Sequence, residues 1–349
     1  MAEIITSPSN PKVKQLLALQ QKSSARRERG LFVVEGRREL QHCIDAGFII
    51  DTIFVCPTLS ETAPLHGGSP LPDFASLIPP LRFAGGPPVH EATGGHGPAG
   101  ESPRSAAPAA EAETAAASPA RSHPRLRKRE GPAAEGSGRG PAQPDGWRGR
   151  LPRSEGQTKV FEVSEEVYRK ISYREGTEGV MAEVKVPERK LEGLELPENP
   201  LVMVLESVEK PGNLGAVLRS ADAAGADAVL VCDPLTDLWN PNLIRASVGA
   251  VFTVPCVTCS SQEAIDWLKA RGIRILTAQL QDSSLYYDCD MTVGTALVMG
   301  TEATGLTPRW RQAADAHIRI PMLGALDSLN VSVSAAILLF EAVRQRRNG

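Results

Sequence analysis

Apolar and polar positions alternate in a regular order from about residue 201 to the end of the chain. Short apolar runs lie at 201–205, 228–232, 253–258, 273–280, 295–299 and 317–322, separated for the most part by segments with helical signals. Those signals include Asn240-Pro241, a capping box from Ser260 to Glu263, and glycines after helical stretches. Apolar strands that alternate with helices predict a parallel sheet covered on both faces.

The final stretch, 316–347, combines a short apolar run, a polar loop and a long apolar segment. The run ends at Pro321-Met322, and Asn330 stands at the start of a helix predicted over 331–343, which arginines follow. Apolar residues lie nearly all round this helix, so we expect it to be largely buried. A polar loop between a buried strand and a buried helix would be held rigidly at both ends. Its backbone N–H and C=O groups could then form hydrogen bonds with a ligand.

The first part of the chain predicts a smaller α/β unit. Helices are expected at 12–21 and 37–46, and strands at 31–34 and 52–56, with a charged loop from Arg26 to Arg29. A strand, a helix capped by Ser164 and a further strand at 182–186 follow residue 159.

Composition changes abruptly between these two groups of elements. From about residue 60 to 157 the chain is rich in Pro, Gly, Ala, Ser and Glu and has few aromatic or β-branched residues. Such a segment cannot bury enough apolar surface to offset its chain entropy, so it is predicted to be disordered. We therefore expect an N-terminal domain formed by 1–59 and 158–187 and interrupted by the 60–157 insertion, a linker at 188–200, and a second domain at 201–349.

Overall charge and cysteine content exclude several classes. The net charge of −3 gives no sign of a nucleic-acid partner, so any such surface must be local. The six cysteines are scattered, no apolar signal region opens the chain and no apolar run reaches about 18 residues, which predicts a cytoplasmic protein without a membrane span.

Three polar loops follow predicted strands of the second domain. The first carries Asn213 and Arg219 in N-x-G-x-x-x-R, the second carries Glu302 in G-x-E-x-x-G-L, and the third carries Ser328 and Asn330. Loops that follow strands of one parallel sheet meet at one edge of that sheet, where ligands bind. We therefore expect a site where these loops converge.

Two other kinds of site were weighed. Cys256-x-x-Cys259 could hold zinc or act in redox chemistry, but no second pair follows and the six histidines lack ligand spacing, so a buried strand end is favoured and no metal is expected. No G-x-G-x-x-G follows the first strand of the second domain, which disfavours a dinucleotide-binding enzyme.

The motifs, in this order and spacing, resemble those of the SpoU (TrmH) family of RNA ribose 2′-O-methyltransferases. The third reads IPM-x-G-x-x-x-SLNVS and leads into LFEAVRQR, and NPNLIRASVGA at 240–250 is also similar to the family. FVVEG at 32–36 and GTEGVMA at 176–182 resemble its RNA-binding domain. The resemblance implies a trefoil knot in the catalytic domain, a homodimer, and S-adenosylmethionine as methyl donor.

The resemblance also assigns roles to single residues. The implied catalytic group, which faces the ribose, is Asn213, Arg219, Glu302, Ser328 and Asn330. The implied cofactor contacts are Leu297, Gly300, Ile320, Met322, Ser328 and Leu329. The N-terminal domain would bind RNA phosphates through Arg26, Arg27, Arg29, Arg37 and Arg38, since guanidinium forks match phosphate oxygens.

Two questions stay open on the sequence. In the family the arginine that corresponds to Arg219 is proposed as a base, yet a guanidinium normally stays charged, so Arg219 could instead bind the adjacent phosphate and stabilise a developing alkoxide. Ribosomal RNA is favoured over transfer RNA, because the N-terminal domain resembles that of the ribosomal members. The alternatives are a tRNA enzyme and an inactive RNA-binding relative, against which the intact motif residues argue.

Overall fold

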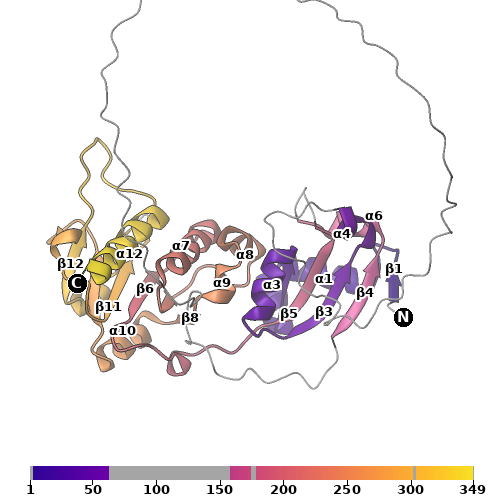
Figure 1. Ribbon diagram of the computed structural model, residues 1–349, viewed down its shortest axis with the longest axis horizontal. Helices are drawn as coiled ribbons and strands as arrows, with labels where there is room; N and C mark the ends of the chain where they lie inside the picture. Colours follow the sequence, from indigo (N-terminus) through magenta and orange to yellow (C-terminus); the bar gives the residue numbers. More distant parts are fainter. Residues whose placement is uncertain (1–2, 63–157, 174–177, 302–303, 349) are drawn as a thin grey trace, which may run out of the picture. The chain divides into compact units, whose positions relative to one another are not determined.

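The computed structural model describes residues 3–62, 158–173, 178–301 and 304–348 (Figure 1). The predicted disordered insertion, from residue 63 to its end at 157, lies outside the described residues. Two sheets organise the rest of the chain.

A five-stranded mixed sheet forms the N-terminal domain. Its strands are β1 (Glu3–Ile5), β2 (Leu31–Glu35), β3 (Ile50–Val55), β4 (Lys159–Val163) and β5 (Val180–Lys185), in the order β1-β4-β3-β5-β2. β4 runs parallel to β3, and β5 runs antiparallel to both β2 and β3. Residues from before and after the long insertion therefore share one sheet, as the sequence predicted. The short strand β1 was not predicted.

Five helices accompany this sheet: α1 (Pro11–Gln21), α2 (Ser23–Arg29), α3 (Arg37–Asp45), α4 (Pro57–Thr62) and α6 (Glu165–Ile171). Ser164 caps α6 as predicted. The loop expected at 26–29 is wrong, because these residues lie in α2, which ends at Gly30 with a φ of 61°. Alanine, arginine and glutamate favour helix, and Arg26 fastens α2 to α1 by donating to the carbonyl of Leu19 at 2.6 Å.

Glu183 on β5 is a buried carboxylate beneath α1. Gln15 Nε2 donates to its Oε2 at 2.8 Å, while its Oε1 is buried and has no hydrogen-bond partner among the described residues. Burial is the main reason that the pKa of Glu183 is raised to about 7; the charge of Asp51 adds to the rise, while Lys12, the hydrogen bond from Gln15 and Arg29 oppose it.

This shift predicts a pH-dependent stability. The folded protein holds the Glu183 proton more tightly than the unfolded chain does. The contribution of this proton to the free energy of unfolding is therefore fully present below about pH 4.5 and is lost as the pH rises through about 7. Glu183→Gln should raise the free energy of unfolding at pH 8 by about 2 kcal/mol relative to the parent, and by little at pH 4.5. Urea unfolding of both proteins between these pH values measures the difference. A difference that does not change with pH would contradict the assignment.

A seven-stranded, all-parallel sheet forms the C-terminal domain. Its strands are β6 (Leu201–Glu206), β7 (Ala228–Cys232), β8 (Cys256–Cys259), β9 (Arg274–Ala278), β10 (Ser284–Leu285), β11 (Thr295–Met299) and β12 (Ala316–Arg319), in the order β10-β12-β9-β11-β6-β7-β8. β6 thus lies between β11 and β7 at the centre of the sheet. The predicted parallel architecture is confirmed; the trefoil knot stays a prediction.

Helices cover both faces of this sheet (Figure 1). The helices are α7 (Pro211–Ala224), α8 (Pro241–Ser247), α9 (Ala250–Thr253), α10 (Ser261–Ala270), α11 (Pro308–Ala313) and α12 (Val331–Asn348). Met203 and Leu205 of β6 belong to the core that α7 and α12 share, while Val202 and Val204 point into the core formed with α10 and α11. This alternation along one strand explains why its sequence is apolar throughout.

Local signals predicted most of these boundaries. Asn240 caps α8, Ser260 and Glu263 form the capping box of α10, and Gly225 ends α7 with a φ of 66°. The strand expected at 253–258 is shorter, because Phe252 and its neighbours form the helical turn α9 and β8 begins only at Cys256. The short β10 was not predicted.

The last helix differs from its prediction in burial. α12 packs against α7, but Val333 and Phe340 remain 47% and 48% exposed. A helix with apolar residues on all sides is buried only if other elements cover each of its faces. No described element of this chain covers the face that carries Val333 and Phe340.

Aromatic, ionic and cation–π contacts link the N-terminal domain to the segment before α8. Phe32 of β2 stacks on Trp239 with ring centroids 4.5 Å apart, and Arg26 Nε lies 2.6 Å from Asp237 Oδ2 in a buried ion pair. Arg189 lies over the rings of Phe48 and Trp239. Burial lowers the pKa of Arg189, which nearby Cys256 and Cys43 partly oppose.

Candidate functional site

A hollow of about 130 Å³ opens at the carboxyl ends of β6 and β11, beside the start of α12. It is lined by Ser207, Val208, Glu209, Lys210, Asn213, Gly300, Thr301 and Val331. All three polar loops singled out in the sequence border this region, and two of them contribute to its lining directly.

The first loop turns sharply out of β6 into α7. Ser207 has a left-handed φ of 53°, and Pro211 stands in the first turn of the helix, which places Asn213 at the hollow. Gly215 permits α8 to pack on α7, since a Cβ there would lie 2.6 Å from the Cβ of Ala246. Arg219 is exposed on the same helix.

The second loop is a tight turn closed by two backbone hydrogen bonds. The N–H of Thr301 donates to the carbonyl of Gly305 at 3.2 Å, and the N–H of Gly305 donates back at 3.1 Å. A Cβ on Gly300 would lie 2.3 Å from the carbonyl carbon of Gly305, so only glycine fits there. Glu302, predicted to be catalytic, lies outside the described residues.

The third loop meets the first at two asparagines. Asn330 Nδ2 donates to Asn213 Oδ1 at 3.2 Å, and Asn330 Oδ1 accepts from the N–H of Ser332 in the first turn of α12. Ser328 is exposed and donates to its neighbour Asp327 at 3.2 Å. The structure therefore brings Asn213 and Asn330 together, and Ser328 is not among the residues that line the hollow.

The residues implied as cofactor contacts are more dispersed. Gly300 lines the hollow, whereas Leu297 is fully buried within β11. Ile320 packs against the core, and Met322 is half-buried. Leu329 belongs to an exposed segment that Figure 1 shows as a long loop between β12 and α12.

Several residues that line the hollow were missed as site residues. Ser207, Thr301 and Val331 directly follow a strand or begin a helix at the edge where the loops meet. Their residue types gave no reason to choose them. Their positions, at the ends of predicted buried strands or at the start of a predicted helix, could have indicated that they line a site.

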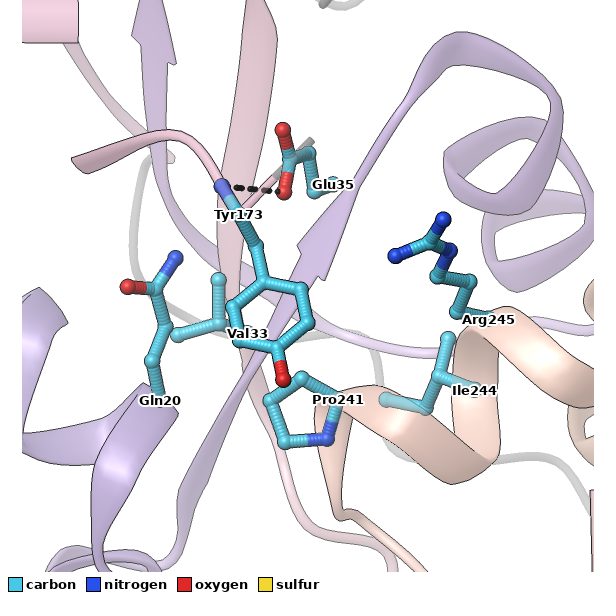
Figure 2. Close-up of a pocket in the computed structure, with 7 residues that line it drawn as sticks. All are labelled: Gln20, Val33, Glu35, Tyr173, Pro241, Ile244 and Arg245. Atoms are coloured by element: carbon cyan, nitrogen blue, oxygen red, sulfur yellow. Dashed lines mark hydrogen bonds between the residues drawn. The ribbon is translucent and has the colours of Figure 1, made fainter. Parts of the chain in front are cut away.

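A second, smaller hollow lies between β2 and α8 (Figure 2). Figure 2 shows the ring of Tyr173 in the middle, with Gln20 on one side and Ile244 and Arg245 of α8 on the other; Val33, Glu35 and Pro241 complete the lining. The carboxylate of Glu35 accepts from the N–H of Tyr173 at 3.0 Å, and Tyr173 Oη donates to Asn242 Oδ1 at 2.8 Å. Arg245, which is exposed, also lines this hollow.

The five arginines predicted to bind RNA fall into two groups. Arg27, Arg29 and Arg38 are exposed. Arg26 is buried and ion-paired with Asp237, and Arg37 is half-buried and donates to the carbonyl of Ser60. Burial and pairing leave Arg26 unavailable to a phosphate.

The cysteine pair considered for metal or redox chemistry is divided by the fold. Cys256 is buried at the start of β8, and the near neighbour of Cys259 is Cys232, with the two sulfurs 3.9 Å apart. Within the described residues no group of three or more histidine, cysteine, aspartate or glutamate side chains is placed to hold a metal. Nor does that part of the chain contain a helix long and apolar enough to cross a membrane.

Comparison with known proteins extends the picture. Residues 200–340 match the model of the SpoU rRNA Methylase family, and residues 10–71 match that of the MRM3-like substrate binding domain. RlmB of Escherichia coli (strain K12), a 23S rRNA (guanosine-2'-O-)-methyltransferase, is 38% identical over 176 residues, which are 48% of this chain and 72% of that protein. The chain belongs to the SpoU rRNA methylase family.

Further proteins give consistent matches. The 23S rRNA (guanosine(2553)-2'-O)-methyltransferase RlmP of Bacillus subtilis (strain 168) is 31% identical over 52% of this chain and 71% of its own length. A 23S rRNA (uridine(2479)-2'-O)-methyltransferase of Streptomyces viridochromogenes is 36% identical over 49% of this chain, but the match spans only 61% of that protein. A solved RNA 2'-O ribose methyltransferase superposes with a TM-score of 0.64 over 99% of both chains at 30% identity.

Proposed function

We propose that this SpoU-family chain transfers a methyl group from S-adenosylmethionine to a ribose 2′-hydroxyl of ribosomal RNA. The observation that supports this most directly is the hollow where the loops after β6 and β11 meet the start of α12, with Asn213 and Asn330 hydrogen-bonded at its edge. Its relatives RlmB and RlmP are named as 23S rRNA 2'-O-methyltransferases. Only RNA carries the hydroxyl that such a reaction needs.

The polar groups of the hollow suit the proposed donor. Ser207 and Thr301 offer hydroxyls for a ribose, while Glu209 and Lys210 offer opposite charges for an amino-acid end. Gly300 lines the hollow at the end of β11. When bound, S-adenosylmethionine supplies an electrophilic methyl group.

The chain's own part in the reaction is mainly to position the ribose and to stabilise charge. Asn213 and Asn330 present amides at the hollow, and we propose that they orient the ribose hydroxyls. Arg219 is exposed further along α7, and a guanidinium keeps its charge. We therefore propose that Arg219 binds the phosphate beside the target and stabilises the 2′-oxygen while that oxygen takes the methyl group and its proton passes to water.

Two measurements test this function. Titration calorimetry with S-adenosylmethionine should show saturable binding, and tritium from a labelled methyl group should then enter rRNA rather than tRNA. Donor binding without transfer to either RNA would favour the inactive RNA-binding relative, and transfer to tRNA alone would favour the tRNA alternative. Absence of donor binding would overturn the proposal.

We propose that RNA also lies along the exposed arginines of the N-terminal domain and across the second hollow. Tyr173 and Arg245 present there an exposed ring and an exposed guanidinium, the groups on which unpaired bases stack and phosphates pair. α8, which lines this second hollow, follows β7, and β7 pairs with β6, the strand that ends at the first hollow.

Reversing the charge of Arg27 and Arg29 should weaken RNA binding and leave donor binding unchanged. The Arg27→Glu/Arg29→Glu variant is expected to bind rRNA about tenfold more weakly. The slope of the logarithm of affinity against the logarithm of salt concentration should also become shallower by the loss of about two phosphate contacts. Filter binding at several salt concentrations measures both. The matched control is Arg169→Glu/Lys170→Glu on α6, which changes the net charge equally. Equal losses in the two variants would show a general charge effect instead of a binding surface.

We propose that two copies of this chain associate through the exposed apolar face of α12. Val333 and Phe340 lie seven residues apart on one helix face, and Leu323 in the preceding loop is 97% exposed. An uncovered apolar face of this kind marks an interface. The homodimer and the cytoplasmic location both remain expectations.

Sedimentation equilibrium should give twice the chain mass of 37.3 kDa for the parent protein. Phe340→Glu places a charge in the proposed interface and is expected to sediment as a single chain. Leu235→Glu, which alters an exposed leucine after β7, serves as the control and should remain dimeric. A parent protein that sediments as one chain would contradict the interface.

A further inference from the structure

We propose that Glu206, the last residue of β6, is a positioning residue that fixes the loop from Gly300 to Thr307 at the wall of the methyl-donor pocket. This inference rests on the proposed function, because it assigns a role toward the donor that the hollow is proposed to hold. Glu206 itself does not line the hollow.

The carboxylate of Glu206 is tied to the far end of that loop. Its Oε2 accepts from the backbone N–H of Thr307 at 2.9 Å, and its Oε1 accepts from the hydroxyl of Thr307 at 2.7 Å. Two hydrogen bonds to one residue fix both the distance and the orientation of Thr307 relative to β6.

The near end of the same loop is tied to the same strand. β11 pairs with β6 up to Met299 and Leu205, so Gly300 leaves the sheet beside Glu206. Both ends of the loop are therefore held at the carboxyl end of β6. Between them the loop folds back on itself through the Thr301 and Gly305 hydrogen bonds, and Gly300 and Thr301 face the hollow.

The carboxylate belongs to a buried polar network on the side of the sheet away from α7. Ser261 Oγ donates to Glu206 Oε1 at 3.3 Å and accepts from Trp310 Nε1 at 3.0 Å. Glu206 and Ser261 are each 2% exposed, and apolar residues such as Val204 and Leu306 surround the network. All of the hydrogen bonds to Glu206 come from neutral donors, and no ion pair with a described residue accompanies them.

Such an arrangement is a poor way to gain stability alone. Replacing a buried charged group by apolar residues of similar volume is often neutral or stabilising. Thr307 also stands at the N-cap of α11, where threonine usually accepts a hydrogen bond from the helix, yet its side chain makes no cap hydrogen bond. The hydroxyl donates to Glu206, so the side chain of Thr307 contacts the strand rather than the first turn of α11.

The position of Glu206 in the strand explains how it acts without touching the ligand. The side chain of Glu206 points into the core with α10 and α11, and the next residue, Ser207, turns the chain with its left-handed φ into the hollow. The end of β6 thus contributes Ser207 to the lining of the hollow directly and, through Thr307, holds the loop that contributes Gly300 and Thr301.

Three variants test this role. Glu206→Gln places an amide N–H₂ where carboxylate oxygens accept, and Thr307→Val removes the hydroxyl while keeping the side-chain shape. Thr307→Ser keeps both donors and is the matched control. We expect Glu206→Gln and Thr307→Val to weaken S-adenosylmethionine binding by about tenfold or more in calorimetry, with unchanged rRNA affinity, and Thr307→Ser to bind as the parent does.

A structural role alone would lower the melting temperature without moving these quantities. The variant Glu206→Met/Thr307→Val removes the contact between the strand and the loop and keeps Ser261 as the partner of the Trp310 indole N–H, so it should fold and still bind the donor weakly. Hydrogen exchange of the Thr301 and Gly305 amides should be faster in Glu206→Gln and unchanged in Thr307→Ser.

The outcomes separate this inference from the proposed function. Unchanged amide exchange at Thr301 and Gly305 in Glu206→Gln, or donor affinity equal to that of the parent in Glu206→Met/Thr307→Val, would overturn the role of Glu206. A parent protein that does not bind S-adenosylmethionine would overturn the proposed function, whatever the exchange shows at the loop.

Discussion

Replacing Arg219 by alanine is expected to lower the rate of methyl transfer to rRNA by about a hundredfold to a thousandfold. The guanidinium is proposed to bind the phosphate next to the target ribose and to stabilise negative charge on the attacked oxygen, and the loss of one such donor typically has an effect of this size. Arg219→Lys should restore little activity, because an ammonium group lacks the planar fork that matches a phosphate. Single-turnover methylation with tritiated donor measures the rate.

Donor binding separates this role from a general loss of structure. Arg219 is exposed and does not line the hollow, so calorimetry with S-adenosylmethionine should give the same affinity for Arg219→Ala as for the parent. Arg311→Ala removes another exposed arginine, from α11 on the other face of the sheet, and should methylate normally. Near-normal turnover by Arg219→Ala would show that the assignment is wrong.

Arg346→Ala is expected to lower the free energy of unfolding by about 3 kcal/mol. From the last turns of α12 the guanidinium donates to the carbonyls of Met291, Val293, Asn199 and Pro200 at distances between 2.7 and 3.0 Å. These carbonyls lie in the segments that immediately precede β6 and β11. One side chain therefore connects the C-terminal end of α12 to the start of both strands. Hydrogen bonds to a charged donor contribute more than neutral ones, and their carbonyls lose a partner when it is removed.

Chemical denaturation of the purified variant measures this loss. The neighbouring Arg347 is exposed, so Arg347→Ala is the matched control and should change stability by less than about 0.5 kcal/mol. Arg346→Lys should recover only part of the stability, because the compact ammonium group lacks the planar fork of N–H donors with which the guanidinium contacts the four carbonyls. Equal stabilities for the Arg346 and Arg347 variants would refute the anchoring role.

The sequence predicted elements well wherever the signal lies within a few residues. Helix α7 could be bounded from Gly225 at its end, α10 from its capping box, and β6 from an uninterrupted apolar run between polar neighbours. It failed where a distant contact decides the local structure. The segment that carries Arg26 contains only polar residues and alanine, and its helical form depends on burial against α1 and on Asp237, 211 residues away.

The candidate site shows the same division. Residue types and spacing indicated three polar loops, a parallel sheet and the family resemblance, and these follow from the chain read in order. Which loop residues meet was decided by the tertiary structure, because the contact between Asn213 and Asn330 spans 117 residues and that between Glu206 and Thr307 spans 101. Arg26 is buried and Arg27 is exposed because only one face of α2 packs against the rest of the protein. Hydrophobic periodicity cannot identify that face when both adjacent residues are arginine.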